Sequence, residues 1–199
     1  MAMLSRSIDI PPQWESAARE AATCRGAVMV IGAVDTGKST LVHYLTAHLL
    51  RAGINIALED CDLGQTTVGP PTTVGMACPD SNVHDQAALH PLKMCFMGST
   101  TPAEKIRETI AASGAMVQYA IEQGADFILV DTDGMVEGYP ALKLRSEQIT
   151  LARPAMILAL QRENELEPLL SSLPGIVNGR LMGLPSSALA RSKTYAQRR

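Results

Sequence analysis

The sequence feature that most constrains this chain is a glycine-rich segment at residues 32–39, which reads G-A-V-D-T-G-K-S. It fits the phosphate-binding pattern G-x-x-x-x-G-K-S/T. An apolar run at residues 27–31 precedes it and predicts a buried strand, and residues 40–50 carry apolar side chains at helical spacing. The pattern requires a strand, a loop and a helix in this order, so the sequence predicts a nucleoside triphosphate site.

The residue types of this loop indicate how it would hold phosphates. Glycines allow backbone N–H groups to wrap around a phosphate, and the start of the next helix adds partial positive charge. Lys38 is predicted to bridge the β- and γ-phosphates, and the Ser39 hydroxyl to ligate magnesium. The nucleotide is expected to contact Gly32, Ala33, Val34, Asp35, Thr36, Gly37, Lys38, Ser39 and Thr40.

Composition limits the class of protein. The 199 residues, 46% of them hydrophobic, suit one α/β domain. The four cysteines lack metal-ligand spacing, and no run reaches the roughly 18 apolar residues of a membrane span, so we expect a cytoplasmic protein with reduced thiols and no membrane contact. The net charge of −3 argues against general electrostatic capture of duplex nucleic acid but allows a local basic groove.

Predicted strands and helices alternate along the chain. Further strands are expected at residues 54–58, 92–97, 127–130 and 155–160, and a helix at 104–123. Residues 173–185 are expected to be irregular, with a helix-like segment from Ser186. Such alternation implies a parallel sheet with right-handed crossovers. The predicted fold is therefore α/β, a three-layer P-loop NTPase fold whose mostly parallel sheet is flanked by helices.

The chain is expected to have three parts. Residues 1–25 form a lead-in whose short helix begins after Pro11 and runs through Ala22, since proline is tolerated at a helix start. Residues 26–185 form the P-loop domain, and residues 186–199 form a basic helix.

Aspartates follow two of the predicted strands. Asp60 and Asp62 come after residues 54–58, and Asp131 comes after residues 127–130. In open α/β sheets ligands bind at the carboxyl ends of strands, so these groups are expected near the phosphates. Asp131 is the predicted magnesium-shell carboxylate. A hydroxyl-phosphorylating enzyme also needs a carboxylate that accepts the proton of the attacking group, and spacing leaves Asp60 and Asp62 both open for that role.

Four separated segments each have a more specific pattern. Residues 32–40 read G-x-x-D-x-G-K-S-T, residues 60–65 read D-x-D-x-G-Q with Pro-Pro at 70–71, and residues 98–102 read G-S-T-T-P. Residues 131–138 read D-T-D-G-M-V-E-G. Together these segments resemble the Clp-type polynucleotide 5′-hydroxyl kinases, a family that includes archaeal RNA kinases, the nucleolar pre-rRNA processing kinase and the pre-mRNA cleavage factor subunit.

This resemblance implies ATP- and magnesium-dependent phosphorylation of the 5′-hydroxyl end of RNA or DNA, with RNA favoured. It implies Asp62 as general base, Lys38 as a catalytic phosphate ligand, and Asp60 as a magnesium-shell group beside Ser39 and Asp131. An RNA-processing protein is the partner that the family suggests. The implied substrate contacts are Gln65, Thr66, Thr100 and Met135.

Two features depart from the family pattern. Met135 stands where the family turn carries tryptophan, so this position offers no aromatic face for stacking on a base. Arg191 and Arg198 resemble the beginning of an arginine-bearing lid helix that would neutralise the transferred phosphoryl group, and the sequence stops at Arg199. We therefore expect either a minimal lid or a truncated chain.

Two other functions stay open at this level. The first is a catalytically weak ATP-binding module that acts through a partner protein, which Met135 and the short lid favour. The second is a kinase for a small metabolite, which fits the modest net charge. The absence of an N-K-x-D segment argues against a signalling GTPase.

Overall fold

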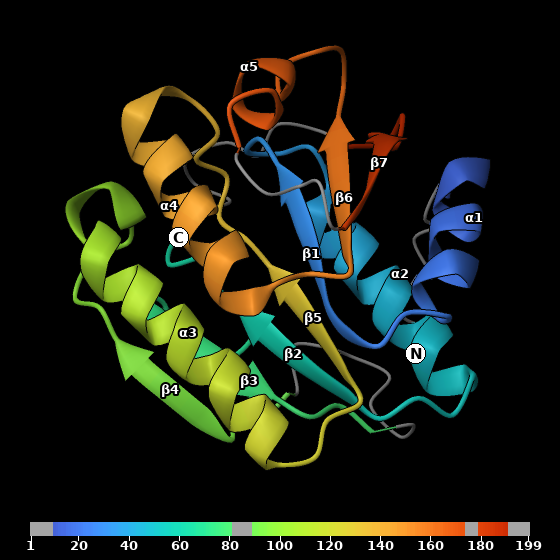
Figure 1. Cartoon of the computed structure of the whole chain (residues 1–199), viewed down its shortest axis with the longest axis horizontal. Coiled ribbons are helices and arrows are strands. Elements are labelled where there is room, and N and C mark those ends of the chain that lie inside the picture. Colours follow the sequence, from blue (N-terminus) through green and yellow to red (C-terminus); the bar gives the residue numbers. More distant parts are fainter. Residues whose placement is uncertain (1–9, 81–88, 174–178, 191–199) are drawn as a thin grey trace, which may run out of the picture.

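The computed structural model describes residues 10–80, 89–173 and 179–190 as one seven-stranded sheet covered by helices (Figure 1). The helices are α1 Pro12–Ala21, α2 Lys38–Arg51, α3 Ile106–Glu122, α4 Gly138–Ala152 and α5 Glu167–Leu170, with a 3-10 turn η2 at Pro102–Glu104. The strands are β1 Gly26–Gly32, β2 Ile56–Asp60, β3 Thr73–Ala77, β4 Lys93–Phe96, β5 Phe127–Asp131, β6 Met156–Gln161 and β7 Arg180–Pro185.

The sheet is mostly parallel, as predicted. Its strand order is β4-β3-β2-β5-β1-β6-β7, and the pairs β2–β5, β5–β1, β1–β6 and β6–β7 are parallel. Strand β3 pairs antiparallel with both β2 and β4, so it is the reversed strand of the described sheet. The carboxyl ends of β1, β2 and β5 therefore meet at one edge of the sheet.

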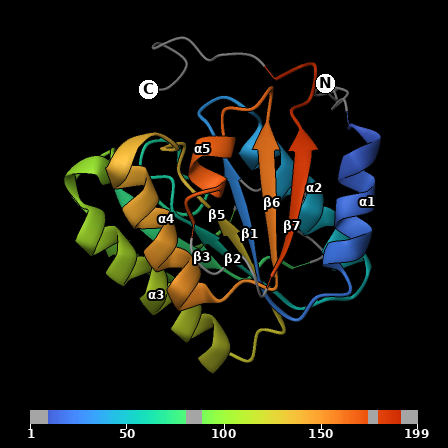
Figure 2. The same cartoon turned by 45° about the horizontal axis from the view of Figure 1, so that its top comes forward.

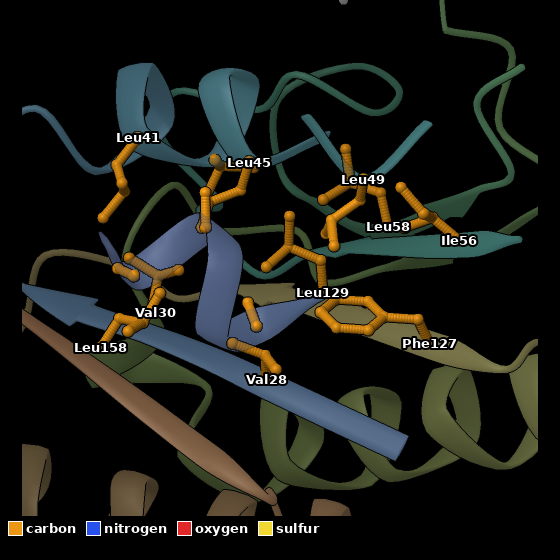
Figure 3. Close-up of a cluster of buried hydrophobic side chains, with 14 of the residues drawn as sticks. Val28, Val30, Leu41, Leu45, Leu49, Ile56, Leu58, Phe127, Leu129 and Leu158 are labelled. Carbon is orange, nitrogen blue, oxygen red and sulfur yellow. The ribbon is translucent and has the colours of Figure 1, made fainter. Parts of the chain in front are cut away.

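Alternation of side chains along β1 divides the core into two layers. Val28 and Val30 face a cluster formed with α1 and α2, whereas Met29 and Ile31 face a cluster formed with α3, α4 and α5. Figures 1 and 2 show α1 and α2 on one face of the sheet and α3 and α4 on the other. Figure 3 shows the first layer, where leucines of α2 lie over β1, β2 and β5. The predicted three-layer P-loop NTPase fold is confirmed.

Several element boundaries differ from the sequence-based expectation. Residues 180–185 form β7 rather than an irregular segment, because they pair along their whole length with β6. The described residues 186–190 contain no helix, contrary to the expected helix-like segment. Strand β3 was not expected, since its sequence T-V-G-M-A lies behind a loop rich in glycine, threonine and proline. Gly75 is needed in this strand because a Cβ there would lie 2.4 Å from the Val68 carbonyl oxygen.

The described residues contain no helix that is long and apolar enough to cross a membrane.

Helix α1 packs on the sheet domain at its β7 side. Trp14 is fully buried, its indole Nε1 donates a hydrogen bond to the Pro185 carbonyl at 2.9 Å, and its ring centroid lies 6.3 Å from that of Tyr44. The lead-in helix is therefore part of the packed body.

We expect Trp14→Ala to lower the free energy of unfolding by about 3–5 kcal/mol, because it removes a buried aromatic side chain and opens a cavity. Trp14→Phe retains most of the ring volume but leaves the Pro185 carbonyl without its donor, so a smaller loss of roughly 1–2 kcal/mol is expected. Urea unfolding followed by far-UV circular dichroism measures both. Equal stabilities of Trp14→Ala and the parent would contradict the packing of α1.

Candidate active site

The phosphate loop between β1 and α2 has a fixed backbone conformation. Asp35 and Gly37 adopt positive φ angles of 62° and 98°. The Thr36 hydroxyl donates to the Ala33 carbonyl at 2.9 Å, and Lys38 Nζ donates to the same carbonyl at 3.0 Å. A Cβ on Gly32 would lie 2.7 Å from the Leu160 carbonyl oxygen, so this position requires glycine. The loop is therefore preformed, with the Lys38 ammonium lying over it.

Lys38 is buried at the carboxyl edge of the sheet. Its burial lowers the pKa of the ammonium group, and the nearby carboxylates of Asp131, Asp62 and Asp133 oppose that shift. The ammonium attracts a phosphate, whereas the carboxylates repel it, so binding of a phosphate here favours a bound cation between the phosphate and the carboxylates.

Asp131 and Ser39 provide oxygen ligands of the kind that magnesium prefers. Asp131 ends β5 directly between Val30 of β1 and Asp60 of β2. Its side chain is buried, the Ser39 side chain hydrogen-bonds to it, and among the described residues its Oδ1 lacks a hydrogen-bond partner. Burial raises the pKa of Asp131 well above its usual value, and Asp60 adds to that rise.

The described residues contain no cluster of three His, Cys, Asp or Glu side chains that could hold a metal alone. Magnesium rarely uses such a cage, since it is usually bound by one or two carboxylates together with waters and substrate phosphates. An unpartnered buried carboxylate oxygen beside a serine hydroxyl fits that mode of binding.

Asp60 organises the loop that follows β2. Its Oδ1 accepts from the backbone N–H of Asp62 at 2.9 Å, and its Oδ2 accepts from the backbone N–H and the hydroxyl of Thr67 and from the Val68 N–H. Burial raises the pKa of Asp60 to about 6, although these donors favour the ionised form. Both carboxylate oxygens are thus engaged in folding the loop between β2 and β3.

Asp62 lies at the start of this loop, and it is only partly buried. Its Oδ1 accepts hydrogen bonds from the backbone N–H groups of Gly64 and Gln65, both at 3.0 Å. These two hydrogen bonds orient the carboxylate through Oδ1, and Oδ2 takes no part in them. The backbone of the predicted substrate contact Gln65 therefore holds the predicted general base in place.

The other predicted substrate contacts lie in the surrounding loops. Thr66 donates its hydroxyl to the Gly69 carbonyl at 3.0 Å. A Cβ on Gly64 would lie 3.2 Å from the carbonyl oxygen of the exposed Thr100, so the loops after β2 and β4 touch. Met135 is partly buried in the turn after β5. Arg191 and Arg198 lie outside the described residues.

Sequence reasoning missed Arg145 in the middle of α4. This side chain is completely buried, and its Nη2 lies 2.7 Å from Asp133 Oδ2 and 3.0 Å from the Asp133 carbonyl oxygen. An arginine in a helical segment ordinarily indicates a solvated face, so the local sequence holds no signal for this contact. The Arg162 side chain, which donates to the Asp35 carbonyl at 2.7 Å, was also missed.

Glu59 lies buried one residue before Asp60, on the opposite face of β2. Its Oε1 accepts from Cys61 Sγ at 3.0 Å, Ser113 hydrogen-bonds to its carboxyl, and its Oε2 has no partner among the described residues. Burial raises the pKa of Glu59 to about 7. The layer between β2 and α3 thus contains an acid that is largely protonated below neutrality.

Comparison with known proteins identifies relatives of this chain. A family model described as mRNA cleavage and polyadenylation factor CLP1 P-loop matches residues 32–199. The chain is 34% identical over 197 residues to the polyribonucleotide 5′-hydroxyl-kinase of Pyrococcus furiosus, covering 98% of this chain and 54% of that protein. The corresponding kinase of Methanocaldococcus jannaschii is 37% identical over 143 residues, covering 72% of this chain and 39% of that protein.

Solved structures share the fold. The Clp1p chain of the Clp1p–Pcf11p complex has a TM-score of 0.73 at 13% identity, covering 94% of this chain and 50% of that chain. The signal recognition particle receptor FtsY of Elizabethkingia anophelis bound to GDP has a TM-score of 0.51 at 15% identity, covering 90% of this chain and 60% of that chain. This chain spans about half the length, or less, of the curated kinases it matches.

The buried Glu59 predicts a specific pH dependence of stability. Between the ordinary value of 4.5 and the folded value of about 7, the folded chain keeps a proton that the unfolded chain releases, so raising the pH favours unfolding. The loss for this group amounts to roughly 3 kcal/mol and ends once the folded carboxyl ionises. Glu59→Gln should therefore gain stability relative to the parent as the pH rises from about 5 to 8.

Urea unfolding at several pH values measures this difference. Glu163→Gln, at an exposed position after β6, serves as control and should follow the parent at every pH. A constant difference between Glu59→Gln and the parent across this range would contradict the assignment.

Proposed function

This chain belongs to the CLP1 P-loop family, and on that basis we propose that it transfers the γ-phosphoryl group of ATP to the 5′-hydroxyl end of a polynucleotide, with RNA favoured over DNA. The curated archaeal relatives carry the name polyribonucleotide 5′-hydroxyl-kinase, which supports this choice of acceptor. We include magnesium as the cation and place the transfer unit within residues 26–185, with α1 packed against it.

One observation carries the proposal. The buried Lys38 ammonium lies within the electrostatic reach of both Asp131, which fits a magnesium shell, and Asp62, which is oriented by two backbone donors. A site that only stored a nucleotide would need the loop and the metal carboxylate. A second carboxylate that lies partly open beside the same ammonium is what a hydroxyl-phosphorylating enzyme requires.

Each residue of the site has a distinct task. The backbone N–H groups of the phosphate loop and Lys38 hold the β- and γ-phosphates. Ser39 and Asp131 would hold magnesium, which supplies charge neutralisation to the phosphates when bound. Asp62 accepts the proton of the 5′-hydroxyl as that oxygen attacks the γ-phosphorus in line, and the bond from the γ-phosphorus to the bridging oxygen of ADP breaks.

The substrate contacts surround this centre. We assign Gln65, Thr66, Thr100 and Met135 to the acceptor end, since their loops border the Asp62 carboxylate or follow Asp131. Arg191 and Arg198 are proposed to neutralise the transferred phosphoryl group. The solved complex of Clp1p with Pcf11p supports proposing a protein partner for this chain as well. The proposed compartment is the cytoplasm.

Transfer of labelled γ-phosphate from ATP to matched RNA and DNA oligonucleotides with a 5′-hydroxyl tests the function. The parent should label RNA, Lys38→Ala should lose transfer, and Asp62→Asn should lose about 10²–10⁴-fold in rate because the general base is removed. Asp126→Asn, exposed just before β5 at the opposite edge of the sheet, serves as a matched control with parental activity.

Other outcomes would overturn parts of the proposal. Parental activity in Asp62→Asn would remove its role as base. Transfer to nucleosides but not to oligonucleotides would identify a metabolite kinase. ATP binding that depends on Lys38, without transfer to any acceptor, would leave a nucleotide-binding module that acts through a partner protein.

A separate experiment distinguishes Asp131, which we assign to the metal, from Asp60, which the family resemblance also implies for it. Asp131→Asn should raise the magnesium concentration needed for half-maximal transfer, because it neutralises the carboxylate beside Ser39. Asp60→Asn should instead destabilise the loop after β2, by about 1–3 kcal/mol, with little change in the magnesium requirement. Magnesium titrations of transfer, together with urea unfolding, measure both effects. A shifted magnesium requirement in Asp60→Asn would restore it to the metal shell.

A further inference from the structure

Arg145 is a charged side chain in an unusual place. It projects from the middle of α4, has no exposed surface, and forms an ion pair with Asp133 in the turn after β5. Arginine is almost never fully buried unless it is paired. Its Nη1 also donates to Gln148 one turn further along the same helix, so the guanidinium is held from two directions.

The guanidinium holds the backbone of the turn as well as its carboxylate. Arg145 Nη2 donates to the Asp133 carbonyl at 3.0 Å and to the Met135 carbonyl at 3.5 Å. Asp133 Oδ1 in turn accepts from the Met135 N–H at 2.7 Å. Helix α4 thereby fixes the conformation of the segment that begins two residues after Asp131.

This turn is pressed against the phosphate loop. A Cβ on Gly134 would lie 2.4 Å from Val34 Cγ2 and 2.9 Å from the Val34 nitrogen. Because the two segments are this close, a displacement of the turn would either move the phosphate loop or open a gap between the turn and that loop. The chain of contacts runs from Arg145 through Asp133 and Gly134 to Val34, which is one of the residues expected to contact the nucleotide.

Stability alone does not explain this pair. Replacing a buried ion pair by apolar side chains of similar volume is often neutral or stabilising, because the desolvation of both charges offsets their attraction. A guanidinium with several simultaneous acceptors does, however, fix geometry closely. The arrangement is therefore suited to setting the position of the turn.

We propose that Arg145 is a positioning residue for phosphoryl transfer, which aligns the turn of Asp133, Gly134 and Met135 with the phosphate loop without contacting nucleotide or acceptor. This inference rests on the proposed kinase function. It predicts a larger effect of Arg145 on the rate of transfer than on ATP binding, because Lys38 Nζ is held by the Ala33 carbonyl of its own loop.

Three variants separate positioning from folding. Arg145→Met leaves the Asp133 carboxylate buried without its partner and should both lower the melting temperature and reduce kcat on the order of 100-fold. The double variant Arg145→Met/Asp133→Asn removes both charges, so its melting temperature should recover toward the parent while kcat stays low. Arg145→Lys keeps the charge and should restore part of kcat. Arg19→Met, which breaks the exposed ion pair between Arg19 and Glu15 on α1, serves as the control. It should have the kcat and the stability of the parent.

The readouts are kcat and KM for ATP with a 5′-hydroxyl RNA oligonucleotide, at a temperature below every melting transition. If the double variant regains its melting temperature but keeps a low kcat and a nearly parental KM for ATP, the result supports Arg145 as a positioning residue. Recovery of kcat in parallel with melting temperature shows a purely structural role and overturns the proposal. An inactive parent overturns the kinase function and this inference together, whereas an active parent with unchanged kcat in Arg145→Met overturns this inference alone.

Discussion

The burial of one ammonium group among several carboxylates at a single sheet edge is the constraint on which the rest of this structure depends. Lys38 loses hydration on burial, and Asp131, Asp62 and Asp133 compensate for part of that loss. Such charges are costly in an apolar interior and are retained only where geometry holds them close together. Parallel pairing of β1 with β5 and of β5 with β2 supplies this geometry, because it brings three strand ends into register.

Apolar packing on both faces of the sheet offsets the free-energy cost of burying charged groups at its edge. Strand β1 contributes Val28 and Val30 to one layer and Met29 and Ile31 to the other, so both sides of the strand that leads into the phosphate loop are anchored. The phosphate loop therefore follows a strand that is packed on both of its faces. Rigid support of this kind is what keeps Lys38 and Ser39 at fixed positions relative to Asp131.

The parts of the site that the sequence predicts are those with local causes. The phosphate loop, the strand before it and Asp131 at a strand end each depend on short patterns, and the structure has the strand, loop and helix where they were expected. Strands β3 and β7 depend on pairing with distant segments, and their own sequences lack a clear alternation. The engagement of Asp60 by Thr67 and Val68 could not be foreseen either, because it requires the loop to fold back on the strand end.

The composition of helix α4 explains why the sequence alone does not predict the contact between Arg145 and Asp133. The face that α4 turns inward carries Leu144, Arg145, Gln148 and Ile149, so polar and apolar side chains share one buried stripe. A helix selected for stability alone would fill this stripe with apolar residues. Natural proteins break such local rules mainly where function requires it. The polar half of this stripe meets the turn after β5, which is the part of the sheet edge next to Asp131, and its position there is consistent with α4 serving the site as well as the core.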